Sequence, residues 1–136
     1  MIKAFIDPDL ILEFLMDKQP QSRESAKIFT LAERNEVKLL VSAQAFSNLY
    51  LILKQYASHE KVVEKLQLLT QLVEVGTLDQ KAVLSALNSN FNNLIDGIQN
   101  YCVESNNVKV LITRRHKDYK NSGLSIMSPA LFLEMV

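Results

Sequence analysis

The stretch AFIDPDLI, residues 4–11, joins the end of a strand pattern to the start of a helix pattern. Residues 2–6 form an apolar run with the length of a short buried strand, and apolar side chains recur at helical spacing from Leu10 onward. Two carboxylates, Asp7 and Asp9, interrupt the apolar run at the corner between the two patterns. This stretch therefore predicts a strand that leads directly into a helix.

Further strands and helices alternate along the rest of the chain. Apolar, β-branched runs predict strands at 38–41, 108–112 and 125–127, and 73–75 fits either a short strand or the end of a helix. Helical patterns occupy about 22–34, 42–57, 58–72, 81–87 and 90–105, and a last helix begins at 129. Ser22, Ser42 and Asp79 are the expected N-caps, Pro129 has the first helical position, and Gly76 interrupts the pattern.

This alternation predicts an α/β fold with a parallel sheet and helices on both faces. Ligands of such sheets bind outside the carboxyl ends of the strands, where the strand order reverses. The polar residues that follow the predicted strands are Asp7, Ser42 with Asn48, and Thr113 with Arg114 and Arg115.

Composition limits the possible partners and locations. A length of 136 residues predicts one domain over 1–136, and the net charge of zero excludes a global attraction to nucleic acid or to anionic membranes. The single Cys102 cannot form an internal disulfide, which fits a reducing compartment. Because no apolar run has the length of a signal peptide or a membrane span, we expect a soluble cytoplasmic protein with no membrane partner.

Four stretches in order resemble the PIN domain family, the metal-dependent ribonuclease fold of VapC-type toxins, and in particular its small bacterial group. They are AFIDPDLILEFL, VSAQAFSNLYLIL, FNNLIDGIQNY and VLITRRHKDY, and the likeness extends over residues 1 to about 133. The resemblance implies a three-layer sandwich with a central parallel sheet of four to five strands. It also implies an acidic pocket that binds Mg²⁺ or Mn²⁺, hydrolysis of RNA, and a role as the toxin of a toxin–antitoxin pair.

The resemblance assigns roles to individual acids. Asp7 and Asp96 correspond to catalytic residues and metal ligands, and Asp118 to a further metal ligand. Mg²⁺ takes oxygen ligands from one or two carboxylates and completes its shell with water and phosphate. Two aspartates from separate elements are therefore enough to begin such a site.

The sequence also departs from the family pattern. Asn48, expected with Thr113 to support the site, stands where the family usually has Glu, and Ile95 replaces the Glu of a Glu-Asp pair. Arg115 stands where the family has a polar or acidic residue. With this reduced number of carboxylates, we expect weak metal binding or none.

The run RRHKDYK, residues 114–120, is the only basic concentration in the chain. Arg114, Arg115 and Lys117 are candidate ligands for RNA phosphates, with Tyr119 as a stacking surface for a base. The alternative is a solvated loop in which Tyr119 is buried.

Other interpretations of the acidic residues stay open. Asp7 followed by Pro8 is a good N-cap, so helix capping alone explains its presence. Arg115, with a guanidinium that binds carboxylates in a fork, could pair with Asp7 and Asp96 in place of a metal. The protein would then be a catalytically inactive PIN-fold module that binds RNA or protein.

A receiver-like or flavodoxin-like fold would need a phosphate-binding loop or a lysine after a late strand, and the motifs supply neither.

The apolar content of residues 49–53 and 62–73 is richer than one buried helix face requires. We therefore expect a homodimer, and an antitoxin could lie across the same region.

Overall fold

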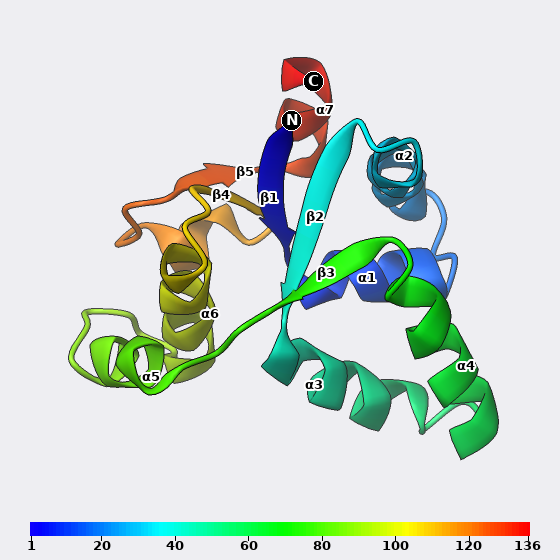
Figure 1. Cartoon of the computed structure of the whole chain (residues 1–136), viewed down its shortest axis with the longest axis horizontal. Coiled ribbons are helices and arrows are strands. Elements are labelled where there is room, and N and C mark those ends of the chain that lie inside the picture. The colour runs from blue at the N-terminus through cyan, green and yellow to red at the C-terminus, as the bar shows by residue number, and fades with distance from the viewer.

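The computed structural model describes residues 1–136 (Figure 1). Its strands are β1 (Ile2–Ile6), β2 (Val37–Ser42), β3 (Val73–Gly76), β4 (Val110–Ile112) and β5 (Ser125–Met127). Its helices are α1 (Pro8–Leu15), α2 (Ser22–Glu33), α3 (Ala43–Leu53), α4 (His59–Leu69), α5 (Gln80–Leu87), α6 (Leu94–Ser105) and α7 (Pro129–Met135), with a 3₁₀ turn at His116–Tyr119.

All five strands form one parallel sheet in the order β3-β2-β1-β4-β5. The chain adds β2 and β3 on one side of β1 and then returns to place β4 and β5 on the other side. The strand order therefore reverses between β1 and β4, where Ile6 is in register with Ile112. Asp7 and Thr113 follow these two residues, so the topology places both at the switch point of the sheet.

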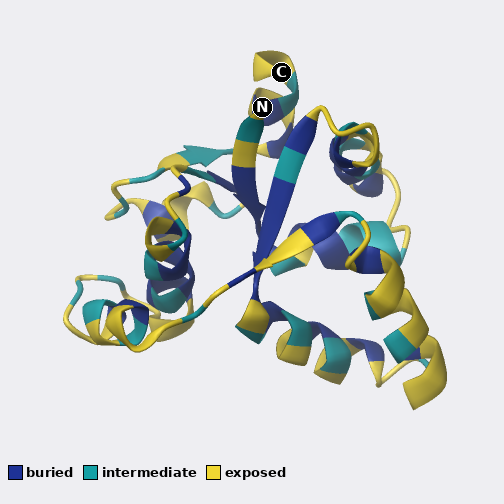
Figure 2. Ribbon diagram, in the orientation of Figure 1, coloured by how far each residue is buried: buried dark blue, intermediate teal, exposed yellow.

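Helices cover both faces of the sheet, because successive strand residues point to opposite sides. In β1, Ala4 and Ile6 pack in a core with α1, α2, α3, α4 and α7. Phe5 faces the other way and packs in a second core with Cys102 and Val103 of α6. The central strands β1 and β2 are accordingly mostly buried (Figure 2). These layers confirm the predicted α/β sandwich.

Several local predictions need correction. Ser22 is not the N-cap of α2; the cap position is Gln21, and the Ser22 hydroxyl donates instead to Asp17 Oδ1 at 3.1 Å. The helix predicted over 90–105 begins only at Leu94, because the Asn93 side chain accepts the first free N–H groups. The helix predicted over 42–57 ends at Leu53. For residues 73–75 the strand alternative is correct, and the strand includes Gly76. Ser42 and Asp79 are N-caps, as expected.

None of the helices has the length and apolar character needed to cross a membrane.

Candidate functional site

Asp7 lies at the end of β1 and uses its two carboxylate oxygens for different purposes. Oδ1 accepts the backbone N–H of Asp9 at 3.0 Å and so caps α1. Oδ2 accepts the hydroxyl of Thr113 at 2.6 Å, from the end of β4. With 1 % of its surface exposed, Asp7 is buried at the switch point of the sheet. Helix capping and a role in a site are therefore compatible, because each involves a separate oxygen.

Asp96 approaches the same point from the first turn of α6. Asn93 is the N-cap of this helix, and the side-chain oxygen of Asn93 accepts the backbone N–H groups of Ile95 and Asp96. Asp96 is 4 % exposed, and its Oδ1 accepts the hydroxyl of Tyr119 at 3.3 Å. Gln99, one turn further along α6, donates to the same hydroxyl at 2.9 Å. Burial, followed by the charges of Asp7 and Asp96, raises the pKa of Tyr119, which therefore stays a neutral donor to Asp96.

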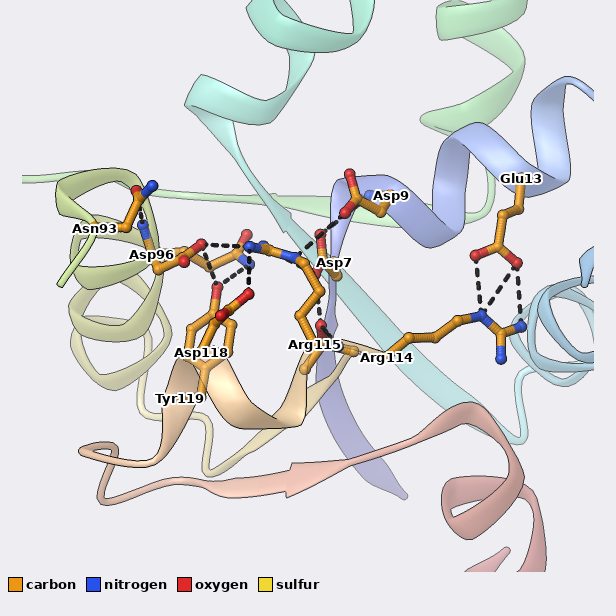
Figure 3. Close-up of polar contacts among 11 residues, drawn as sticks. Asp7, Asp9, Glu13, Asn93, Asp96, Arg114, Arg115, Asp118 and Tyr119 are labelled. Carbon is orange, nitrogen blue, oxygen red and sulfur yellow. Dashed lines mark hydrogen bonds and ion pairs between the residues drawn. The ribbon is translucent and has the colours of Figure 1, made fainter. Parts of the chain in front are cut away.

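Arg115 joins these acids through its guanidinium (Figure 3). Nη1 lies 2.8 Å from Asp96 Oδ1 and 3.4 Å from Asp118 Oδ2. Nη2 lies 3.2 Å from Asp7 Oδ2, and Nε lies 3.3 Å from both Asp7 Oδ2 and Asp9 Oδ2. One cation thus contacts four carboxylates, of which Asp7 and Asp96 are buried and the other two lie at the rim.

The electrostatics of the cluster favour the charged guanidinium. Burial acts to lower the pKa of Arg115, but Asp7 and Asp96 outweigh it, so the pKa rises above its ordinary value. For Asp9, burial and the charge of Asp7 raise the pKa, and Arg115 opposes this shift. Four carboxylates around one guanidinium leave the ionised cluster with an excess of negative charge.

Other predicted site residues lie at different distances from the acids. Asn48 lines a pocket of about 320 Å³ beside them, together with Ile52 and Ile95, but forms no hydrogen bond to an acid. Lys117 is exposed on the 3₁₀ turn and pairs with none of the acids of the cluster. Thr113 also accepts the backbone N–H of Arg115 at 3.0 Å, so its hydroxyl connects Asp7 to the backbone of Arg115.

Two predictions for the basic run are not supported by the geometry. Arg114 points away from the acids and pairs with Glu13 at 3.0 Å (Figure 3). It also pairs with Glu24 at 2.9 Å. Tyr119 is 2 % exposed and its ring packs edge-on against Phe91, so it offers no stacking surface to a base. Of the three candidate cations in the basic run, only Arg115 enters the acidic cluster.

Sequence reasoning missed three contributors to the site. Asp9 received no role beyond its place at the corner between strand and helix, yet its carboxylate contacts Arg115. Gln99 and the hydroxyl of Tyr119 hold Asp96 from within the second core. The spacing of Gln99, three residues after Asp96 on one helix, was the available signal.

The donor set does not fit a divalent metal in this arrangement. Both oxygens of Asp7 are engaged, and Oδ1 of Asp96 accepts from two donors. The position between the two buried acids is taken by guanidinium nitrogens. In addition, no three Asp, Glu, His or Cys side chains form a group that could hold a metal ion. A metal could reach Asp7 and Asp96 only after Arg115 moves away.

Comparisons with known proteins identify the fold. A family model described as PIN domain matches residues 3–117. No curated protein matches the sequence. The structure is similar to DNA-bound VapBC from Salmonella typhimurium, with 14 % identity over 95 % of this chain and 99 % of that chain and a TM-score of 0.72.

Two further solved structures share the fold. VapBC-1 from nontypeable Haemophilus influenzae is 21 % identical over 96 % of this chain and 99 % of that chain, with a TM-score of 0.66. Mycobacterium tuberculosis VapC20, a toxin that cleaves the sarcin-ricin loop, is 10 % identical over 79 % of this chain and 86 % of that chain, with a TM-score of 0.62.

Proposed function

The chain belongs to the PIN domain family, and on this basis we propose that it is the toxin of a toxin–antitoxin pair, acting as an endoribonuclease on RNA phosphodiesters. The observation that carries the proposal is the convergence of Asp7 and Asp96 at the switch point of the sheet. Parallel sheets bind their ligands at this position. The similar fold of a toxin that cleaves the sarcin-ricin loop supports RNA as the substrate class.

Dependence on Mg²⁺ or Mn²⁺ is the finer part of this proposal. Asp7 and Asp96 are the oxygen donors that a hard cation prefers, and Asp118 is a third carboxylate at the rim. Asn48 would add an uncharged donor from the wall of the pocket. Because Arg115 contacts all three carboxylates, metal-dependent hydrolysis requires its guanidinium to leave them first.

A cleavage assay tests this function. Purified chain is incubated with single-stranded and structured RNA in Mg²⁺ or Mn²⁺, and Asp7→Asn and Asp96→Asn are compared with the parent. Both variants should lose cleavage. Asp79→Asn is the control, because Asp79 caps α5 in the way that Asp7 caps α1 but lies outside the site. An Asp7→Asn variant that cleaves as fast as the parent contradicts the assignment.

A second candidate function is a catalytically inactive PIN-fold module that binds RNA or protein. The observation in its favour is the set of ion pairs between Arg115 and the two buried acids, together with the uncharged Asn48 and Ile95. This module would bind a partner without cleaving RNA in either metal. Gel-shift and cleavage assays on the same RNA preparations therefore separate the two functions.

The antitoxin belongs to the proposal as the partner, and the solved VapBC complexes of similar fold support it. Apolar side chains open to a partner are present on α3, on α4 and in the turn between them, where Leu51, Leu68 and Tyr56 are 65 %, 56 % and 69 % exposed. We propose a cytoplasmic location, where RNA and an antitoxin would meet the chain.

A homodimer through this surface also stays a prediction. Leu51→Glu should shift the molecular mass measured by light scattering from dimer to monomer, because it places a charge on the apolar contact. Leu84→Glu on α5, where the leucine is 48 % exposed, is the control.

A further inference from the structure

We infer that Arg115 is the resident cation of the acidic centre and that it keeps divalent metal out of the free chain. The inference concerns the same site as the proposed function and deepens it. It rests on the contacts of the guanidinium and not on any assumed catalytic step.

The contacts of Arg115 take up the oxygens that a metal would need. Asp7 Oδ2 receives Nε at 3.3 Å and Nη2 at 3.2 Å in addition to the Thr113 hydroxyl, while Asp7 Oδ1 is used by the helix cap. Asp96 Oδ1 receives Nη1 at 2.8 Å. The guanidinium therefore lies between the two acids, in the place where a shared metal ion would have to bind.

Two of the acids that face Arg115 are buried. The side chains of Asp7 and Asp96 are only 2 % and 6 % exposed. Removing one partner of a buried ion pair leaves an uncompensated charge, which is strongly unfavourable. Arg115 supplies this compensation without the dehydration that Mg²⁺ resists. A metal that entered the centre would have to displace a guanidinium that already forms charge-assisted hydrogen bonds.

The position of Arg115 is fixed from several sides. Its backbone N–H donates to Thr113 Oγ1, and its guanidinium carbon lies 5.7 Å from the centre of the Tyr119 ring. The preceding residue, Arg114, is held by Glu13 and Glu24 on the other side of the turn. These contacts hold the start of the 3₁₀ turn so that one arginine points inward and the other outward (Figure 3).

Titration with Mn²⁺ tests the inference, with binding followed by calorimetry and by the electron paramagnetic resonance signal of free Mn²⁺. The parent should show no saturable binding. Arg115→Gln should bind one Mn²⁺ per chain, and Asp7→Asn in that background should abolish the binding. Arg114→Gln is the matched control and should behave like the parent. Circular dichroism confirms that each variant is folded.

Two results would overturn the inference. One is saturable Mn²⁺ binding by the parent that disappears in Asp7→Asn, because the metal would then enter beside Arg115. The other is a folded Arg115→Gln variant that binds no Mn²⁺, because Arg115 would then not be what excludes the metal.

A measurement on the parent decides the matter if Arg115→Gln does not fold. The Nε–H signal of Arg115 in a ¹⁵N NMR spectrum should stay sharp when Mn²⁺ is added. Selective broadening of this signal, relative to that of Arg114, would place the metal at the acidic centre and contradict the inference. The inference concerns the chain without RNA, and the cleavage assay concerns the chain with RNA bound, so the proposed function and the inference can fail independently.

Discussion

Arg115 Nη1 lies 2.8 Å from Asp96 Oδ1, and this is the shortest of the ion pairs that the guanidinium forms. Through Asp7 and Asp96, Arg115 links the ends of β1 and β4 to the first turn of α6. The residue that closes the candidate site is therefore also a tertiary link between both sides of the sheet.

The first prediction follows from the different burial of the partners of two consecutive arginines. Arg115→Ala should lower the free energy of unfolding by about 2–3 kcal/mol, because it leaves two buried carboxylates without their cation. Arg114→Ala should cost less, about 1 kcal/mol, because its partners Glu13 and Glu24 are 14 % and 35 % exposed and so remain partly solvated without it. Urea unfolding of both variants measures the difference. Equal losses would show that the acidic centre does not depend on Arg115.

The second prediction separates the two roles of Asp7. Asp79→Ala removes a helix N-cap and a long, exposed hydrogen bond of 3.5 Å from Ser105, and should cost about 1 kcal/mol. Asp7→Ala removes a cap, the hydrogen bond from Thr113 and one partner of Arg115, so its loss should exceed that of Asp79→Ala by about 1–2 kcal/mol. The two variants are compared by urea unfolding at one pH. If they cost the same, Asp7 stabilises the fold only as a cap.

The third prediction concerns the end of β3. A Cβ added to Gly76 would lie 2.6 Å from Cζ of the fully buried Phe5, so Gly76→Ala should destabilise the fold by about 1–3 kcal/mol. Gly123 is the matched control, because a Cβ there would meet its nearest neighbour, Glu104 Oε1, at 3.8 Å. Thermal unfolding of both alanine variants tests the contrast. A stable Gly76→Ala protein would mean that Phe5 can move within the second core.

The fourth prediction is a pH dependence that arises from the buried thiol. Burial, with a smaller contribution from Asp79, raises the pKa of Cys102 from 9.0 to about 11. Below pH 9 the thiol is protonated in both the folded and the unfolded chain, so it adds no pH dependence to the free energy of unfolding. Between pH 9 and pH 11 the unfolded chain loses this proton more readily, so stability should fall as pH rises, by at most about 1.4 kcal/mol per pH unit.

Cys102→Ala removes this contribution while leaving the other titrating groups in place. Its stability should therefore fall less steeply than that of the parent in the same pH range. The melting temperatures of both proteins, measured in steps of pH, give the comparison. Identical slopes would contradict the assignment to Cys102.

The alternation of strands and helices could be predicted from the sequence, because the hydrophobic pattern is local. The same pattern placed Asp7 at the end of a strand and Asp96 in the first half of a helix, and their meeting was implied by the family resemblance. Helix starts were less predictable. Ser22 has the right chemistry for an N-cap, but its hydroxyl binds Asp17 instead, and this depends on how the preceding loop folds.

The opposite directions of Arg114 and Arg115 could not be predicted from the sequence. Both arginines follow β4 within one basic run, and each finds carboxylates that are distant in the sequence. Arg114 reaches Glu13 and Glu24, while Arg115 reaches Asp7 and Asp96. Only the tertiary arrangement of α1, α2 and α6 decides which arginine meets which acids. The possible pairing of Arg115 with Asp7 and Asp96 could be foreseen, but the pairing of Arg114 with Glu13 and Glu24 could not.

The most direct test of the central claim is a crystal structure of the parent chain grown in Mn²⁺, with anomalous diffraction data used to locate the metal. We expect no anomalous peak within coordination distance of Asp7 and Asp96, and a guanidinium of Arg115 between them. A Mn²⁺ ion bound by both acids, with Arg115 turned toward solvent, would contradict it.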